Sequence, residues 1–163
     1  MADDVRRIRP DEGHTLKAMR LAALRDAPGA FAQTFAAVRH KTDEDWARDA
    51  ARYASAATDA CFLAEDGSQI TGMGGVFVAD AHGELVAMWT RPDARRRGAA
   101  RRIIDAVAAW CRQTGLSELR TGVVDGNAAA ATLYERAGFV PTGEVRALAD
   151  GRRLEVRLSR SLA

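Results

Sequence analysis

The sequence has no long apolar run and very few cysteines. No stretch of about 18 apolar residues occurs, so we expect no membrane-spanning helix. The start of the chain, Met1-Ala2-Asp3-Asp4, is acidic and has no apolar segment, so we expect no secretory signal. The two cysteines, Cys61 and Cys111, are too few for a disulfide scaffold. We therefore expect buried free thiols, a reducing compartment and a cytoplasmic protein.

Patterns for metal sites and common nucleotide loops are also missing. The three histidines, His14, His40 and His82, are isolated, and no Cys/His cluster has metal-ligand spacing, so no metal is expected. The phosphate-loop pattern G-x-x-x-x-G-K-[ST] does not occur. The run Gly72-Met73-Gly74-Gly75 does not fit G-x-G-x-x-G and lies inside a strand-like segment. The usual nucleotide-binding loops are therefore excluded.

Lysine is nearly absent, with only Lys17 and Lys41, so arginine carries the positive charge. The net charge is +2, and five arginines lie within residues 95–102. Without those five, the net charge would be −3. Because nucleic-acid-binding proteins usually spread basic residues along a face, this concentration favours one polyanionic small molecule. A solvated helix face would give the same pattern.

The arginine-rich segment follows a strand and opens a helix. Residues 85–90 form an apolar run typical of a buried strand, and Pro92 ends it. Apolar residues then recur at helical spacing over residues 103–110. A helix N-terminus has free N–H groups and the positive end of the helix dipole, which suit phosphate. Gly98 and Ala99-Ala100 are small enough for a ligand to reach the backbone.

The rest of the chain predicts an α/β (α+β) fold in one domain, residues 1–163. Asp11 is the expected N-cap of a first helix, and Thr42 or Asp43 that of a second, with a loop through Phe31 and Phe35 between them. A turn is expected at His82-Gly83. Strands are expected at residues 5–9, 61–65, 70–79, 85–90, 119–124, from 139 onward and at 154–158, and a last helix over 127–138.

Two motifs then resemble those of a known family. Arg95, Gly98 and Ala100 fit R-x-x-G-x-G/A, and Asn127 to Phe139 fit N-x-x-A-x-x-L-Y-E-x-x-G-F. In this order, the motifs resemble the GNAT superfamily of acetyl-CoA-dependent N-acetyltransferases. The resemblance implies a central mixed, mostly antiparallel sheet of about six to seven strands. It also implies a splay between the fourth and fifth strands and about four flanking helices.

The resemblance implies acetyl-CoA as co-substrate, bound along the splay. Backbone groups of residues 88–90 would pair with the pantetheine arm, and N–H groups of residues 96–100 would hold the pyrophosphate. The candidate cofactor-binding residues are Met88, Trp89, Thr90, Arg95, Arg96, Arg97, Gly98, Ala99, Ala100, Arg101, Asn127, Ala130 and Tyr134.

Acetyl transfer requires a donor for the developing oxyanion and a proton for the leaving thiolate. A backbone N–H within residues 88–90 is the candidate oxyanion donor. The resemblance places the hydroxyl of Tyr134 near the thioester sulfur. With a reference pKa of about 10, a tyrosine is protonated at neutral pH and can protonate a thiolate. From the residues alone, Tyr134 could equally be a packing aromatic.

The general base is less clearly marked. Some relatives carry a glutamate on the strand before the Asn127 helix, and Gly122 stands at that position here. Glu84 is the candidate base, with a surface charge at a strand edge as its alternative role. Asp125 is the next candidate, and catalysis through ordered water stays open.

The acceptor is expected to be a primary amine of a small molecule that attacks directly in a ternary complex. The alternatives are a protein or peptide N-acetyltransferase acting on an α-amino or lysine group, a non-catalytic acyl-CoA-binding domain, and an acetyltransferase of charged tRNA. Arg20, Arg25, Arg146 and Arg153 lie in segments expected near the acceptor and would favour an acceptor with a carboxylate. We expect no nucleic-acid or membrane partner, and a monomer or homodimer.

Overall fold

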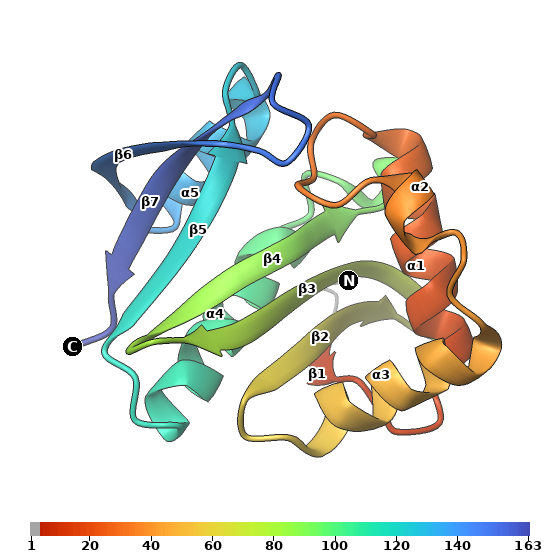
Figure 1. The fold of residues 1–163 in the computed structure, drawn as a ribbon. Coiled ribbons are helices and arrows are strands. Elements are labelled where there is room, and N and C mark those ends of the chain that lie inside the picture. Colours follow the sequence, from red (N-terminus) through yellow and green to blue (C-terminus); the bar gives the residue numbers. More distant parts are fainter. Residues whose placement is uncertain (1–3) are drawn as a thin grey trace.

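The strands form one mixed sheet (Figure 1). The computed structural model describes residues 4–163, so Met1-Ala2-Asp3, on which the secretory-signal expectation largely rests, lies outside the described residues. The strands are β1 (Asp4–Arg7), β2 (Asp59–Asp66), β3 (Gln69–Ala79), β4 (His82–Thr90), β5 (Glu118–Val124), β6 (Val140–Ala147) and β7 (Leu154–Ser161). Their order is β1-β2-β3-β4-β5-β7-β6, and β4 and β5 are the parallel pair. The mixed, mostly antiparallel sheet predicted from the sequence is confirmed.

Helices cover both faces of this sheet. They are α1 (Gly13–Asp26), α2 (Phe35–Val38), α3 (Asp43–Ser55), a 3-10 turn (Pro92–Ala94), α4 (Ala99–Gln113) and α5 (Ala128–Arg136). Figure 1 shows α4 behind the sheet and α1 to α3 gathered on the opposite side. Within residues 4–163, no helix has the length and apolar character needed to cross a membrane.

Each face of the sheet packs its own hydrophobic core. Under α4, Ile103, Ile104 and Val107 are fully buried against the strands. Under α1 and α3, Leu24 and Leu63 are buried in a second cluster. Burying one such side chain contributes about 1.5–3 kcal/mol, so the two cores together fix β3 and β4 from both sides.

The N-cap residues show where the first helices begin, and they correct two details of the sequence prediction. Thr42, one of the two N-caps predicted for the second helix, caps α3 and forms a capping box with Asp45. Helix α1 has Glu12 at the N-cap position instead of Asp11, and the Glu12 carboxylate accepts hydrogen bonds from Arg6. The expected loop contains the short helix α2, because the Thr34 hydroxyl caps it. The turn expected at His82-Gly83 lies earlier, since β4 already begins at His82.

Two loops that are distant in the sequence meet at one end of the molecule (Figure 1). Arg153, in the loop between β6 and β7, donates hydrogen bonds to the carbonyl oxygens of Gly29 at 3.1 Å and Phe31 at 2.6 Å. Asp150 holds the same guanidinium at 2.6 Å. We call this contact between Arg153 and the 29–31 loop the clasp.

Candidate active site

Strands β4 and β5 separate from each other along their length. They pair only over Gly83–Leu85 and Leu119–Thr121, whereas β4 continues to Thr90 and β5 to Val124. Beyond this fork, the edge of β4 that faces β5 has no strand beside it within the described chain. Unpaired backbone N–H and C=O groups at such an edge are ready to bond a ligand. The splay predicted between the fourth and fifth strands is therefore present.

A bulge in β4 lies at the opening of this fork. Its pairing with β3 shifts register between Val86 and Trp89, and Ala87 has a φ of 56°. Positive φ is uncommon for residues other than glycine, and such residues cluster at functional sites. Trp89 is buried, and its indole N–H donates to Asp26 at 2.9 Å. The bulge thus changes the direction of the backbone at residues 88–90, where the family resemblance implies contact with the cofactor.

The turn after β4 exposes the N-terminus of α4. Arg96 and Gly98 have φ angles of 64° and 86°, and the helix begins at Ala99. Residues 95–98 are exposed, whereas Ala99 is buried against the core. The first N–H groups of the helix therefore face outward with the positive end of the dipole, as a phosphate site requires.

Most arginine side chains of this turn have protein partners. Arg95 binds Asp26 at 2.5 Å and the Thr90 carbonyl at 3.0 Å. Arg101 binds Asp105 at 3.3 Å and the Arg136 carbonyl at 2.9 Å. The sequence suggested mobile charge, but these two side chains fasten the turn to α1 and α5. The exposed backbone of the turn, with Arg96 beside it, is consequently the part that has free groups to offer an anion.

Helix α5 presents polar groups to the fork from the other side. The Asn127 side chain caps α5 by accepting a hydrogen bond from the Ala130 N–H at 3.2 Å. Both residues line the cavity at the fork, as does Tyr134 one helical turn further on. Three residues of the second motif, Asn127, Ala130 and Tyr134, therefore lie together at the fork, whereas Arg95, Gly98 and Ala100 of the first motif lie outside the cavity lining.

Tyr134 is buried, and its ring packs edge-on against Phe139 with centroids 5.4 Å apart. Burial raises the pKa of Tyr134 to about 12, against a smaller opposing effect of its hydrogen bond with Thr121. Thr121 in turn donates to the Leu85 carbonyl at 3.0 Å, just where β4 and β5 part. Tyr134 therefore holds its proton at neutral pH and is fixed at the fork.

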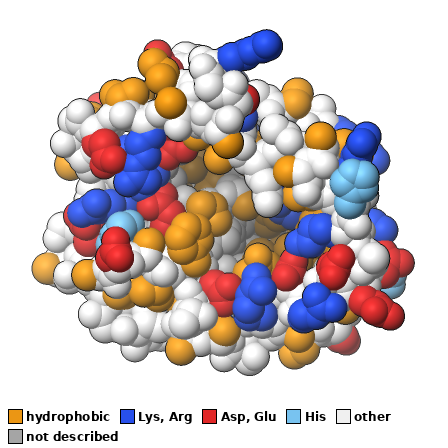
Figure 2. Space-filling view, viewed as in Figure 1, with side chains coloured by type: hydrophobic (Ala, Val, Ile, Leu, Met, Phe, Trp, Pro, Cys, Tyr) orange, Lys and Arg blue, Asp and Glu red, His pale blue; other side chains and the backbone are white. Residues whose placement is uncertain are grey.

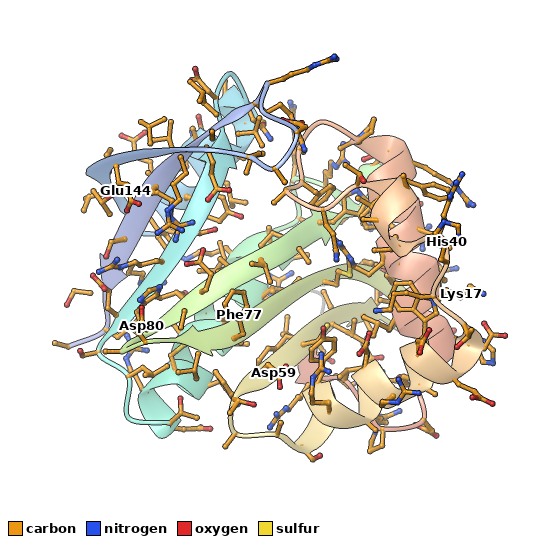
Figure 3. All side chains as sticks on the ribbon, viewed as in Figure 1. Lys17, His40, Asp59, Phe77, Asp80 and Glu144 are labelled. Atoms are coloured by element: carbon orange, nitrogen blue, oxygen red, sulfur yellow. The ribbon has the colours of Figure 1, made fainter. Side chains whose placement is uncertain are left out.

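A cavity of about 530 Å³ extends from the fork toward α1 and α3. Figure 2 shows it as a hollow in this face, with acidic and basic side chains on both sides. Figure 3 shows Phe77 of β3 and Asp59 of β2 on the same face, and both line the hollow. The cavity joins four of the predicted cofactor residues, Met88, Asn127, Ala130 and Tyr134, to the helices expected to bind an acceptor, whereas Trp89, Thr90 and residues 95–101 lie outside its lining.

Comparison with known proteins assigns the family. A model of the acetyltransferase (GNAT) family matches residues 21–139. The chain belongs to the GNAT family. The family resemblance carried by the two motifs is thus confirmed, and the expected class of enzyme, an acyltransferase, is confirmed at the level of the family.

Individual GNAT relatives match this chain over a shorter stretch or at low sequence identity. A mycothiol acetyltransferase of Geodermatophilus obscurus is 36% identical over 48% of this chain and 28% of its own length, so the match spans less than a third of that relative. A GNAT acetyltransferase structure from Streptococcus pneumoniae has a TM-score of 0.82 at 16% identity and covers 99% of both chains. A Salmonella typhimurium structure described with its cofactor acetyl-CoA has a TM-score of 0.77 at 18% identity, covering 100% of this chain and 95% of that one. At such identities, these two structures show the GNAT fold alone.

Glu84, the candidate base of this GNAT chain, is buried in an ion pair. Its Oε1 accepts from Arg157 and lies 3.3 Å from the His82 ring nitrogen. Glu84 lines the cavity, whereas Asp125 is exposed and lies outside its lining. The structure thus brings Glu84, but not Asp125, to the cavity that holds Tyr134.

Glu155 is a cavity residue that the sequence analysis missed. Its side chain covers Gly122 and binds Arg157 at 2.6 Å. Alternation along β7 puts Glu155 and Arg157 on one face, but the pairing of β7 with β5 is not visible in the sequence. The register between these strands would have been needed to find Glu155.

Arg20 of α1 also lines the cavity, as the sequence suggested for an acceptor-binding arginine. It is 9% exposed, donates to Gln33 at 2.9 Å and lies over the Phe31 ring at 5.6 Å. Its Nη1 has no hydrogen-bond partner within residues 4–163, and burial lowers the pKa of Arg20. The cavity therefore contains a buried cation without a carboxylate partner in the described chain.

Proposed function

We propose that this chain transfers the acetyl group of acetyl-CoA to a primary amine. One observation carries the proposal. The open edge of β4 and the protonated hydroxyl of Tyr134 lie at one fork that opens into a cavity, and the exposed N-terminus of α4 follows the end of β4 along the chain. This arrangement offers backbone partners for an extended amide chain and a proton donor at the fork, with an anion site beyond the end of β4.

The residues present fit acetyl-CoA. The edge of residues 88–90 has no strand beside it, although the Thr90 carbonyl already accepts from Arg95, and it would bond the amides of the pantetheine arm, with Asn127 and Ala130 lining the opposite side of the fork. The N–H groups of residues 96–100 would hold the pyrophosphate, with Arg95, Arg97 and Arg101 at its edge. Gly98 has no side chain to obstruct that approach.

The chemistry falls to two groups of the chain. Bound acetyl-CoA supplies an activated acetyl thioester. A backbone N–H within residues 88–90 donates to the developing oxyanion, and Tyr134 donates its proton to the leaving sulfur. Because burial raises the pKa of Tyr134 to about 12, the hydroxyl is fully protonated before the reaction. Glu84 stays the candidate base from the sequence.

A small-molecule acceptor is favoured over a protein or peptide because the cavity of about 530 Å³ is of the size that encloses small ligands. A nucleic-acid acceptor is disfavoured because most arginines of the 95–102 turn, Arg96 aside, are engaged with carboxylates or backbone oxygens. The buried free thiols Cys61 and Cys111 support the cytoplasm as the location.

The test is calorimetric titration with acetyl-CoA, followed by a panel of amines with release of free thiol as the readout. We expect saturable binding and thiol release that depends on the amine. No binding at millimolar acetyl-CoA would overturn the proposal. Binding without turnover of any amine would instead identify a non-catalytic acyl-CoA-binding domain.

A further inference from the structure

The carboxylate of Glu155 fills the space above Gly122. A Cβ atom at residue 122 would overlap Oε1, Cδ and Cγ of Glu155, so a glycine is needed there. In the antiparallel register of β5 and β7, Glu155 lies opposite Val124 and Arg157 lies opposite Gly122. The Glu155 side chain therefore leans along β5 toward the fork, although it comes from another strand.

Glu155 lies at the same fork as the predicted proton donor, Tyr134. Pairing of β4 with β5 ends at Thr121, so Gly122 is the first residue of β5 beyond the fork. Thr121 hydrogen-bonds Tyr134, and successive strand residues face opposite sides of a sheet. Tyr134 and Glu155 thus flank the fork from its two sides and line one cavity. Glu84 lies earlier, within the paired part of β4.

The charges around Glu155 favour an ammonium ion. Arg157 is shared by two carboxylates, Glu84 and Glu155, and His82 stands behind Glu84. Arg157 also influences Glu144 of β6, whose pKa is lowered by Arg146 first and by Arg157 to a lesser extent. Arg157 donates to Oε1 of Glu155, which leaves Oε2 without a partner in the described chain.

We propose that Glu155, in place of the candidate Glu84, receives the acceptor's ammonium group and removes its proton; this inference rests on the proposed function. Oε2 takes one proton from R–NH3+, giving R–NH2 and a carboxylic acid. The nitrogen lone pair then forms the N–C bond with the acetyl carbonyl carbon, and the C–S bond breaks with its electron pair on sulfur. Tyr134 protonates the sulfur, and a second proton leaving the nitrogen restores Tyr134. Glu155 finally releases its proton to water, so the net products are amide, thiol and H+.

Glu155→Gln tests this role because glutamine keeps the size and accepts from Arg157 but cannot take the proton. With an alkylamine at pH 7, we expect kcat/KM to fall by about 10²–10⁴. With trifluoroethylamine, which is already neutral at pH 7, it should fall less than about threefold. A merely structural role would affect both amines equally, and that result would overturn the inference. The inference would also be overturned if Glu155→Gln kept more than a third of the wild-type kcat/KM with the alkylamine.

A relocated carboxylate gives a second measurement. Glu155→Ala removes the atoms that would overlap a side chain at residue 122. The double variant Gly122→Glu, Glu155→Ala should therefore have a kcat/KM with the alkylamine at least tenfold higher than that of Glu155→Ala alone. Glu144→Gln is the matched control, since Glu144 also pairs with an arginine two residues on but is exposed on β6 (Figure 3). Calorimetry should give unchanged acetyl-CoA affinity in Glu155→Gln. A wild type that acetylates no amine would refute the proposed function itself.

Arg20 of α1 provides an independent observation about the part of the acceptor that does not carry the reacting amine. Arg20 is more than nine-tenths buried, lines the cavity and has an unpartnered Nη1. A buried guanidinium without an anion is strongly unfavourable, and its neighbours here are the neutral Gln33 and the Phe31 ring. We infer that Arg20 binds an anionic group of the acceptor, so that the preferred substrates are amines that also carry a carboxylate.

Amino acids and their amides distinguish this inference. Wild type should acetylate ω-amino acids about 10- to 100-fold more efficiently in kcat/KM than the matching ω-amino amides. Arg20→Met should bring that ratio near one, mainly through KM, without lowering the melting temperature. Arg25→Met is the matched control, because Arg25, which the sequence also placed near the acceptor, lies on the same helix but is exposed, packs over Phe35 at 5.3 Å and lies outside the cavity lining. Equal wild-type use of acids and amides would overturn the inference.

Discussion

At the scale of single residues, Tyr134 combines burial with a fixed hydroxyl. The ring packs against Phe139 and the hydroxyl bonds Thr121. Tyr134→Phe keeps the ring, so the fold and the acetyl-CoA affinity should survive. The proton donor is lost, so kcat and kcat/KM should fall together by about 10²–10⁴. Thiol release with the best amine, measured from pH 6 to 10, checks this.

Calorimetric titration of the same variant with acetyl-CoA supplies the control for binding. If Tyr134→Phe keeps more than about a third of the wild-type kcat, Tyr134 is a packing residue and water protonates the thiolate.

Residues close in sequence were predictable, and residues paired across strands were not. Asn127 and Tyr134 share one helix, so a single motif located both. Glu155 meets Gly122 only through the register of β5 and β7, and Arg157 meets Glu84 across 73 residues. Arg95 was expected to carry mobile charge because its partner, Asp26, lies 69 residues away. Local patterns contain no information on such contacts.

At the scale of elements, the two ends of α4 allow a matched experiment. Gly98 and Gly115 flank this helix with φ angles of 86° and 83°. Alanine at either position is strained by about 1–2 kcal/mol, and at residue 98 its Cβ would also come within 3.0 Å of the mobile end of Arg102, so both substitutions should lower stability, Gly98→Ala by at least as much as Gly115→Ala. Only Gly98→Ala adds a methyl group to the anion turn, and it should weaken acetyl-CoA binding at least about tenfold.

Urea unfolding and calorimetric titration of both alanine variants give the two quantities. Equal acetyl-CoA affinity in Gly98→Ala and Gly115→Ala would show that the turn does not hold the cofactor. Gly98→Val should abolish binding altogether.

Periodicity and N-cap residues predicted which segments are helices more reliably than they predicted where each helix begins. The apolar stripe of α4 and the Thr42 cap predicted two helices correctly. Helix α2 was missed because four residues are too few for a periodic pattern. The start of α1 was misplaced because Glu12 is engaged by Arg6 of β1, a tertiary contact.

At the scale of the whole molecule, two buried thiols and a buried tyrosine hydroxyl should make the free energy of unfolding fall at high pH. Burial raises the pKa of Cys61 to about 12 and that of Cys111 to about 11, as it does for Tyr134. The unfolded chain releases these protons at lower pH than the folded chain, so the free energy of unfolding falls as pH rises above about 9. Each thiol contributes about 1.4 kcal/mol per pH unit between its two pKa values.

Urea unfolding at pH 8, 9 and 10 measures this slope, with little background because the chain has only two lysines. Cys61→Ala should reduce the slope by the share of one group. A free energy of unfolding that is constant from pH 8 to 10 would contradict the expectation.

The clasp has a consequence for how this enzyme can diverge. Arg153 binds the main-chain oxygens of Gly29 and Phe31 and touches no side-chain acceptor in that loop. Ala30, Phe31 and Gln33 of the same loop line the cavity. Mutation can therefore change this wall of the cavity, where we propose that the acceptor binds, while the loop stays anchored. Under that proposal, substrate choice can change during evolution without loss of the fold.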